Sequence, residues 1–452
     1  MDALDAAVEK MRAEGLGEAA VETFARQYRR LRDGETGTLP EAEIEPVAEL
    51  PDAEDLPEAD APLDQVVVIK LNGGLGTSMG MTRAKSLLEV KDGQTFLDLT
   101  AQQILDLRER SGARLPLVLM NSFATRDDSL AALERYPDLS AGLPADFVQN
   151  KVPKLREDDL QPVSWERDPA LEWAPPGHGD LYTALVTSAM LEAMLDDGYR
   201  WAFVSNSDNL GAVLEPRILA WLAQSEAPFL MEVADRTASD RKGGHLARRR
   251  ADGALVLREI AQTPDEDVDA FQDIERHRYF NTNSLWIDLH ALRDVLGEAG
   301  VIDLPMIVNR KTVDPADKSS TPVIQLETAM GAAIGVFEGA AALRVPRSRF
   351  VPVKTTNDLL SLRSDAYVVG EDHAVRLAPE RDGVPPFVDL DADHFKLVGD
   401  FEARFPAGAP SLVGCDELHV HGDVTFGRDV RVRGSVTVEG PTRVPDGAVL
   451  EG

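Results

Sequence analysis

A strand-like run that leads directly into a glycine-rich loop is the most constraining feature of the chain. Residues 66–71 are Val-Val-Val-Ile-Lys-Leu, and four glycines lie within residues 73–80. Because glycine has no side chain, the backbone N–H groups of such a loop can approach a ligand and point at phosphate oxygens. An ordinary turn is the alternative, but no second strand follows at hairpin distance. The segment therefore predicts a phosphate-handling loop.

The spacing of these glycines excludes two common nucleotide loops. A P-loop needs the pattern G-x-x-x-x-G-K-[ST], whereas Gly76 and Gly80 are four residues apart and Lys85 follows five residues later. The dinucleotide fingerprint would need glycine at position 79, which is Met79. The loop therefore belongs to another kind of phosphate site.

Strand-like and helix-like segments alternate after this loop. Four segments are rich in Val, Leu, Ile and Phe, as in strands covered on both faces: 65–71, 115–121, 199–205 and 228–234. Three segments have helical spacing of apolar residues: 97–109, 180–195 and 216–223. The alternation predicts an α/β fold with a mostly parallel central sheet, in which ligands bind beyond the carboxyl ends of the strands.

The N-terminal residues differ from this pattern. Residues 3–33 predict two short amphipathic helices around Gly15 and Gly17 that pack on the main body. Residues 41–60 contain nine carboxylates, three prolines and no basic residue, a composition that favours a hydrated segment. We therefore expect residues 1–62 to form two helices and an exposed acidic linker, followed by a catalytic domain over 63–366.

A six-residue repeat sets the last part of the chain apart. One set of aliphatic residues recurs at Leu418, Val424, Val430 and Val436, and a second set recurs at Val420, Phe426, Val432 and Val438. Each turn of a parallel β-helix buries such positions against the next turn. An antiparallel meander is the alternative. We expect residues 367–452 to form a β-helix domain whose end surfaces favour a homo-oligomer.

The composition restricts what the chain binds as a whole. With 47 Lys and Arg against 78 Asp and Glu, the formal net charge is −31, which disfavours nucleic acid and anionic membranes as partners. Any bound phosphate must therefore be met by local cations. The single cysteine, Cys415, excludes an intrachain disulfide, and the N-terminus lacks the pattern of a signal peptide. We expect a cytoplasmic protein.

Two further segments carry candidate chemistry. Asp208 follows the strand predicted over 199–205, where its carboxylate suits Mg²⁺ that also binds phosphate oxygens; a turn-capping role is the alternative. His178 lies between Gly177 and Gly179, which expose the ring and make burial in a packed core unfavourable. Asp180 is in place to cap the helix that follows.

Several blocks, in order along the chain, together resemble the eukaryotic-type UTP:glucose-1-phosphate uridylyltransferases, also called UDP-glucose pyrophosphorylases. They are residues 70–80 with 85–86, 147–149 with 153, 175–180, 205–211, 242–244, 257–262, 280–286, 323–327 and 345–354. The resemblance covers about 65–440. It implies a GT-A-like nucleotidyltransferase domain, a C-terminal left-handed parallel β-helix, and Mg²⁺-dependent conversion of UTP and glucose 1-phosphate into UDP-glucose and pyrophosphate.

The resemblance also implies a role for each matching position. Lys85 and Lys354 would meet the phosphates from opposite sides, His178 the phosphate of glucose 1-phosphate, and Asp208 the metal. Residues expected at the uracil are Gln149, Asn72, Gly73, Gly74 and Gly177. Residues expected at the glucose ring are Asn206, Gly244, Glu259, Asn281 and Asn283. Because Lys85, His178 and Lys354 surround the phosphates with Mg²⁺, we expect all of them to supply positive charge.

General chemistry supports two of these roles. Uracil presents an N–H donor between two carbonyl acceptors, and the carboxamide of Gln149 carries both complements. Asn281 and Asn283 lie two residues apart in an expected strand, so regular alternation would place both side chains on one face. A turn or capping role is the alternative for each asparagine.

The glycine loop departs from the family pattern at one place, and two rival functions fit the sequence. Where the family has Cys-Lys-Gly-Pro, this chain has Met81-Thr82-Arg83-Ala84, so we expect Arg83 to restore the missing charge and the loop to be looser. A pyrophosphorylase for N-acetylhexosamine 1-phosphate is the nearest rival enzyme. A catalytically silent scaffold is the rival from another class, and the joint presence of the four phosphate-site residues argues against it.

Overall fold

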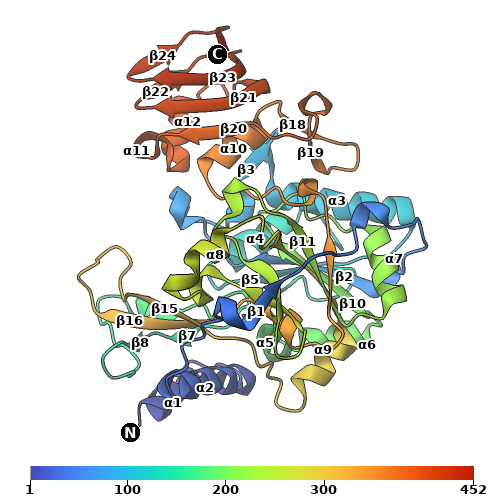
Figure 1. The fold of residues 1–452 in the computed structure, drawn as a ribbon, viewed down its shortest axis with the longest axis vertical. Helices are drawn as coiled ribbons and strands as arrows, with labels where there is room; N and C mark the ends of the chain where they lie inside the picture. Colours follow the sequence, from blue (N-terminus) through green and yellow to red (C-terminus); the bar gives the residue numbers. More distant parts are fainter. Residues whose placement is uncertain (1) are drawn as a thin grey trace.

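A ten-stranded mixed sheet forms the centre of the protein, in a computed structural model that describes residues 2–452 (Figure 1). The main path of the sheet is β1-β12-β14-β10-β2-β5-β6, and β11, β13 and β17 pair beside it. The strands are β1 (Ile44–Pro46), β2 (Val66–Asn72), β5 (Leu117–Asn121), β6 (Asp146–Val148), β10 (Trp201–Asn206), β11 (Phe229–Asp235), β12 (His245–Arg249), β13 (Leu255–Arg258), β14 (Tyr279–Asp288) and β17 (Ala341–Arg344).

The α/β class is confirmed, but the expectation of a mostly parallel sheet is wrong. The strands β10, β2, β5 and β6 are parallel to their neighbours in that order, whereas β14 is antiparallel to β10, β11 and β12. Continuous apolar runs such as 228–234 indicate only that both faces of a strand are covered. They do not indicate the direction of the neighbouring strand.

Helices cover both faces of the sheet because its buried strands are apolar on both sides. Val67 and Ile69 of β2 pack in one apolar cluster with α5, α6 and α9, while Val66 and Val68 pack in another with α3, α4 and α7. The helices are α3 (Phe96–Ser111), α4 (Arg126–Leu133), α5 (Asp180–Thr187), α6 (Met190–Asp196), α7 (Pro216–Ser225) and α9 (Leu289–Leu296). The helix expected over 180–195 is therefore two helices, because Ala189 has φ +58° between them.

The two N-terminal helices are confirmed as α1 (Ala3–Ala13) and α2 (Glu18–Arg32). They share an apolar cluster with three short strands, β7 (Val152–Pro153), β8 (Leu155–Arg156) and β16 (Pro322–Glu327). The expected linker after them is not a solvated strap: β1 pairs with β12, and Ile44 and Val47 are buried. Apolar residues interleaved with the carboxylates supply this burial, and arginines of the body pair with Glu41 and Asp52.

Shorter elements surround the central sheet. The strand β15 (Ile307–Thr312) pairs with β16, β9 (Trp173–Ala174) with β7, and β3 (Glu89–Lys91) with β4 (Gln94–Thr95). The helix α8 (Val268–Gln272) precedes β14, and α10 (Thr356–Arg363) leads to the hairpin of β18 (Tyr367–Val369) and β19 (Val375–Leu377). No helix among residues 2–452 is both long and apolar enough to cross a membrane.

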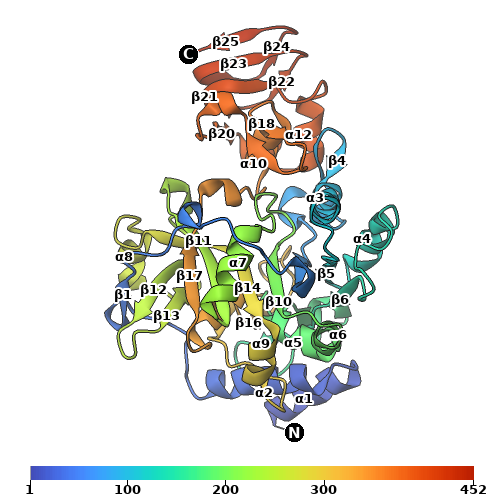
Figure 2. The same cartoon turned by 90° about the vertical axis from the view of Figure 1, so that its right-hand side faces the viewer.

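Residues 387–451 form a C-terminal tower at the end of the molecule opposite to α1 and α2 (Figures 1 and 2). Its strands are β20 (Phe387–Leu390), β21 (Ser411–His421), β22 (Val424–Phe426), β23 (Arg431–Glu439), β24 (Thr442–Val444) and β25 (Val449–Glu451), with helices α11 (Ala392–Phe395) and α12 (Val398–Arg404). All these strands pair in parallel, and Leu418 lies beside Val436, three six-residue repeats later. The antiparallel meander is therefore excluded.

The tower and the body share one apolar cluster. It contains Met79 of the glycine loop and Phe96 of α3 together with repeat residues such as Leu418 and Phe426. At Gly80 (φ +75°), a Cβ would lie 3.2 Å from Leu397 of the tower. The glycine loop therefore rests directly on the tower.

The repeat positions are expected to support the tower. Phe426 is fully buried, and its ring stacks on Phe405 with 4.8 Å between centroids. Phe426→Ala is expected to lower the free energy of unfolding by about 3–5 kcal/mol because it leaves a cavity, measured by urea denaturation. Thr425→Ala on the neighbouring, half-buried position is the control. Equal stability of both variants would contradict the packing described here.

Candidate functional site

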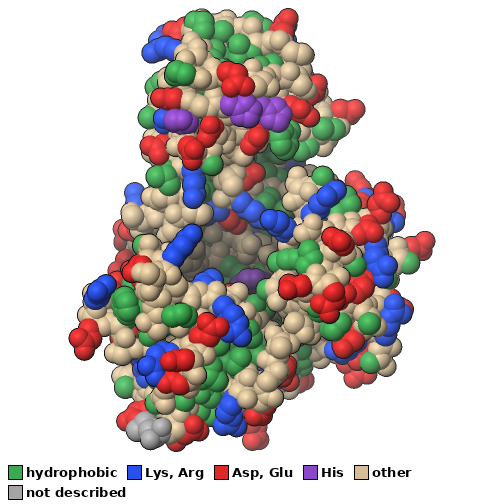
Figure 3. Space-filling model, turned by 60° about the vertical axis from the view of Figure 1, so that its left-hand side comes forward, with side chains coloured by type: hydrophobic (Ala, Val, Ile, Leu, Met, Phe, Trp, Pro, Cys, Tyr) green, Lys and Arg blue, Asp and Glu red, His purple; other side chains and the backbone are tan. Residues whose placement is uncertain are grey.

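The carboxyl ends of the parallel strands β2, β5, β6 and β10 lie level with one another. The register pairs that show this are Asn72 with Asn121, Asn121 with Val148, and Leu71 with Asn206. Loops that leave these ends must therefore meet at one edge of the sheet. Figure 3 shows a hollow between the tower and the body, with Lys and Arg side chains around it.

The glycine loop places backbone against a glutamine at this edge. The Gln149 side chain lies directly against Gly73: a Cβ there would lie only 2.7 Å from Oε1 of Gln149. The Ser122 hydroxyl donates a hydrogen bond to the carbonyl of Gly73 (2.9 Å), and the N–H of Lys85 donates to the carbonyl of Gly74 (3.0 Å). The loop thus folds back so that Lys85 lies beside its first residues.

Lys85 and Asp208 form an ion pair, with Nζ and Oδ2 2.7 Å apart. Both side chains are mostly buried, with exposed fractions of 16% and 23%. The residue expected at the triphosphate and the residue expected at the metal therefore lie together. The ion pair orients both side chains. Lys85 can instead bind an anionic ligand, and Asp208 can bind a cation.

A residue that sequence reasoning missed holds the Asp208 loop from behind. Lys70 of β2 is 3% exposed, and its Nζ donates hydrogen bonds to the Ser205 hydroxyl and the Ala212 carbonyl, each at 2.7 Å. These two partners lie at the start and the end of the loop. Burial lowers the pKa of Lys70 to about 7. A lysine inside an apolar strand was the available signal.

The segment before Lys354 is hydrogen-bonded to the same loop. Asn209 accepts from the Val351 N–H (2.8 Å) and donates to the Arg349 carbonyl (3.1 Å), and the Val353 N–H donates to the Asp208 carbonyl (3.3 Å). This brings the exposed Lys354 to the Asp208 side of the hollow.

The Arg349 guanidinium is itself fixed in the core. It makes two hydrogen bonds of 2.7 Å to the fully buried Glu232, which also accepts from the Trp286 indole N–H. This pair is a second feature that sequence reasoning missed.

His178 is oriented by backbone. The Met330 N–H donates to its Nδ1 (3.0 Å), so Nδ1 is an acceptor and the proton of the neutral ring is on Nε2. His178 is exposed, as its flanking glycines predict, although desolvation by the nearby protein lowers its pKa to about 4. A second proton on the ring would face the Met330 N–H, so this hydrogen bond favours the neutral ring with its proton on Nε2. The positive charge expected of His178 stays a prediction.

The loop around His178 is packed tightly on Thr328. A Cβ on Gly177 would lie 2.4 Å from the Thr328 carbonyl oxygen, and one on Gly179 would lie 2.3 Å from its hydroxyl. The Gly179 N–H donates to the Thr328 carbonyl (2.9 Å). Both glycines are therefore required by close approach.

Asp180 does not cap α5, contrary to expectation. The helix starts at Asp180 with Gly179 as its N-cap, and the carboxylate accepts hydrogen bonds from the Asn150 backbone N–H (2.6 Å) and side-chain Nδ2 (2.9 Å). Desolvation raises the pKa of Asp180 to about 7 despite these two bonds. The two hydrogen bonds of Asp180 join the His178 loop to Asn150, the residue that follows Gln149.

The residues expected at the glucose ring form a second cluster at this edge. A Cβ on Gly244 would lie 2.5 Å from Oε2 of Glu259, and the Asn281 N–H donates to the Gly244 carbonyl (3.0 Å). Burial raises the pKa of Glu259, and the charge of Lys354 partly opposes this shift. Asn206 ends β10, the strand beside β14 that carries Asn281.

Asn281 and Asn283 point the same way, but not for the expected reason. Asn283 has φ +58°, and the pairing of β14 with β11 shifts register there, so alternation is broken by a bulge. The side chains meet because Nδ2 of Asn281 donates to Oδ1 of Asn283 (2.8 Å).

Two expected contributors point elsewhere. The Asn72 side chain is buried and donates to Oδ1 of Asn121 (2.7 Å) and to Ser129 (2.8 Å), so it supports the sheet edge rather than facing the hollow. Arg83 is exposed and lies 3.7 Å from a carboxylate oxygen of Asp128 on α4. The Asp128 carboxylate thus keeps the positive charge of Arg83 away from Lys85.

The metal expectation depends on Asp208 alone. Among residues 2–452, no three His, Cys, Asp or Glu side chains gather in a way that could hold a metal ion. A single carboxylate suits Mg²⁺ whose other ligands are water and phosphate oxygens, and it does not suit Zn²⁺ held only by protein. The donor set therefore fits Mg²⁺ delivered with a nucleotide.

The raised pKa of Asp180 predicts a pH dependence of stability. Between pH 4 and 7 the folded chain keeps a proton that the unfolded chain has lost, so this group stabilises less as the pH rises. Asp180→Asn should therefore gain about 2 kcal/mol relative to the original chain between pH 5 and 7, measured by denaturant unfolding. Asp196→Asn, an exposed carboxylate on α6, is the control. A pH-independent difference would contradict the assignment.

Comparison with known proteins gives consistent matches over almost the whole chain. A family model described as UTP–glucose-1-phosphate uridylyltransferase matches residues 21–433. The barley (Hordeum vulgare) protein of that name is 43% identical over 406 residues, covering 89% of this chain and 84% of its own length. The Saccharomyces cerevisiae protein is 42% identical over 400 residues, covering 87% and 79%.

Solved structures of other proteins also match over the length of the chain. A Leishmania major UDP-glucose pyrophosphorylase mutant in complex with UDP-glucose is 46% identical with a TM-score of 0.94, over 100% of this chain and 98% of that one. A Trypanosoma brucei protein described as UDP-glucose phosphorylase is 48% identical with a TM-score of 0.90, over 100% and 99%. The family model and these relatives each span most of the chain, and the chain therefore belongs to the UTP–glucose-1-phosphate uridylyltransferase family.

Proposed function

We propose that the chain converts UTP and glucose 1-phosphate into UDP-glucose and pyrophosphate, with Mg²⁺. The observation that carries this proposal is the meeting of three features at one sheet edge. A glycine loop faces Gln149, a cluster of amides and a carboxylate surrounds Gly244, and the Lys85–Asp208 pair is joined to the same edge. This arrangement suits a nucleobase, a sugar and phosphates bound in one site.

The nucleotide is recognised by the glycine loop and Gln149. The carboxamide of Gln149 accepts from uracil N3–H and donates to a neighbouring carbonyl, and the backbone of Gly73, Gly74 and Gly177 leaves room for the flat ring. Asn72 acts from behind, because its side chain fixes the strand end through Asn121 and Ser129.

The phosphates meet two cations and one neutral donor. Lys85 and Lys354 neutralise charge on the transferred phosphoryl group, and Nε2–H of His178 donates to a phosphate oxygen without adding charge. Asp208 would hold Mg²⁺, which supplies further charge neutralisation and draws the phosphate oxygens together. The lysines thus counter the repulsion between two anionic substrates in a chain of net charge −31.

The glucose ring is held by the cluster of Asn206, Gly244, Glu259, Asn281 and Asn283. Carboxylate and amide groups suit hydroxyls.

The reaction is an in-line displacement. An oxygen of the glucose 1-phosphate phosphate attacks the α-phosphorus of UTP, a new P–O bond forms, and pyrophosphate leaves with the electron pair of the broken bond. We expect a sequential reaction without a uridylyl-enzyme intermediate. Cys415 is buried in the tower, and His178 carries its proton on the nitrogen that is not bonded to Met330.

Five finer points are part of the proposal. The body has a GT-A-like arrangement with domain boundaries near residues 62 and 366, and the parallel coils of the tower are turns of a left-handed β-helix. The open end of these coils suits a homo-oligomer. The single, buried cysteine is consistent with a cytoplasmic location.

Removal of the proposed metal ligand should slow turnover strongly. Asp208→Asn is expected to reduce kcat/KM about 100-fold to 1000-fold because the phosphate charge is no longer balanced, measured as pyrophosphate released from UTP and glucose 1-phosphate. A chelator should stop the original enzyme, and added Mg²⁺ should restore it. Asp127→Asn, an exposed carboxylate on α4, is the control. Full activity of Asp208→Asn would refute the assigned role.

Base selection should depend on Gln149. Gln149→Leu removes both complements to uracil, so the preference for UTP over CTP should fall by about tenfold to 100-fold. The measurement is kcat/KM for each nucleotide at a fixed concentration of glucose 1-phosphate. Gln224→Leu, on the exposed end of α7, is the control. An unchanged preference would place the base elsewhere.

A further inference from the structure

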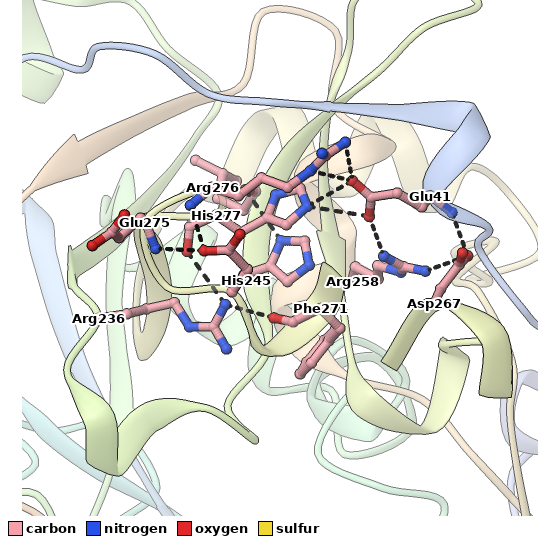
Figure 4. Close-up of polar contacts among 11 residues, drawn as sticks. Glu41, Arg236, His245, Arg258, Asp267, Phe271, Glu275, Arg276 and His277 are labelled. Atoms are coloured by element: carbon pink, nitrogen blue, oxygen red, sulfur yellow. Dashed lines mark hydrogen bonds and ion pairs between the residues drawn. The ribbon is translucent and has the colours of Figure 1, made fainter. Parts of the chain in front are cut away.

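A largely buried network of charged and histidine side chains surrounds Glu41 (Figure 4). Arg258 and His245 are fully buried, and His277 is 1% exposed. The two imidazole rings stack with their centroids 3.8 Å apart. Burial lowers the pKa of both histidines, so the charges of the network belong to its arginines and carboxylates. None of these side chains has a part in the reaction described above.

The centre of this network is Glu41, from the acidic segment that precedes β1. Its carboxylate accepts from Nη1 of Arg258 (2.6 Å), from Nε of Arg276 (2.8 Å) and from Nε2 of His277 (3.0 Å). The backbone N–H of Glu41 donates to Asp267 (2.6 Å), which also accepts from Nη2 of Arg258 (3.0 Å). Glu41 therefore joins three separate parts of the body.

The residues that Glu41 contacts are next to the glucose cluster in the chain and in the sheet. Arg258 precedes Glu259, and it lies opposite His245, which follows Gly244. Gly244 in turn accepts from the Asn281 N–H and lies against the Glu259 carboxylate. A displacement of Arg258 or His245 must therefore move the backbone that presents Gly244 and Glu259.

A second contact from the same segment holds the other side of Glu259. The Leu39 N–H donates to the Gln262 carbonyl (2.7 Å), and the Gln262 side chain accepts from the Glu259 N–H (3.0 Å). Glu259 thus lies between two residues, Arg258 and Gln262, that are hydrogen-bonded to residues 39–41. The Glu259 carboxylate makes no hydrogen bond to residues 39–41. These residues can therefore affect its position only through the backbone.

We propose that Glu41 is a positioning residue for the glucose subsite: it fixes Arg258 and His277 so that Gly244 and Glu259 are held at the distance that accepts the hexose. This inference rests on the proposed function. Arg258 is fully buried with two carboxylates as its ion-pair partners, so loss of the Glu41 charge leaves a poorly compensated charge beside Glu259. Among residues 2–452, none of the hydrogen bonds of this network reaches Gly73, Gln149 or Gly177.

The test compares the binding of UDP and UDP-glucose by titration calorimetry. The two ligands share the nucleotide, so the ratio of their Kd values reports the glucose subsite. Glu41→Gln keeps the shape of the side chain and removes its charge. Glu43→Gln, an exposed residue of the same short turn, is the matched control. Melting temperature is recorded for every variant.

The expected result is about tenfold weaker binding of UDP-glucose by Glu41→Gln, with the Kd for UDP unchanged. Turnover should show the same division, with a raised KM for glucose 1-phosphate and an unchanged KM for UTP. A lower melting temperature with an unchanged Kd ratio would mean a structural role only and would overturn the proposal. Equal weakening of both ligands would also overturn it.

Two further outcomes would also contradict the proposal or the function on which it rests. If Glu41→Gln does not fold, Glu41→Asp, which keeps the charge on a shorter side chain, is measured in the same way, and failure of both variants to fold overturns the proposal. If the unaltered chain binds UDP-glucose no better than UDP, the proposed function fails at the sugar subsite, irrespective of Glu41.

Discussion

The level carboxyl ends of four parallel strands are the constraint on which the rest of the structure depends. The register of β2, β5, β6 and β10 brings Gly73, Gln149 and Asp208 to one edge, although they are far apart in the chain. The antiparallel strand β14 extends this edge with Asn281 and Asn283. One sheet edge therefore carries the glycine loop, the Lys85–Asp208 pair and the asparagine cluster side by side.

Charge in the site is balanced locally and with few groups. The chain as a whole is strongly acidic, yet Lys85 is neutralised by Asp208, and the buried Arg349 by Glu232. The Met330 N–H orients the exposed His178 ring, with Nδ1 as the acceptor. An incoming polyanion therefore exchanges partners with groups that are already oriented, which limits the reorganisation required for reaction.

Much of this arrangement follows from the sequence, and the exceptions have physical reasons. Apolar runs and glycine spacing predicted β2, β10, the loop and the parallel repeats, because these depend on local pattern. The direction of β14, the docking of the acidic segment and the orientation of the His178 ring depend on partners distant in sequence: β10, Arg258 and the Met330 N–H. The bulge at Asn283 and the buried ammonium of Lys70 are also set by tertiary contacts rather than by propensity.

The contact between Gly80 and Leu397 has a mechanical consequence. Met79 belongs to the apolar cluster shared with the tower, and a close-packed interior transmits displacement rather than absorbing it. The glycine loop is therefore held at its far end by a separate structural unit. A tilt of that unit would be transmitted to the loop, so the tower acts as a lever on the backbone at Gly73.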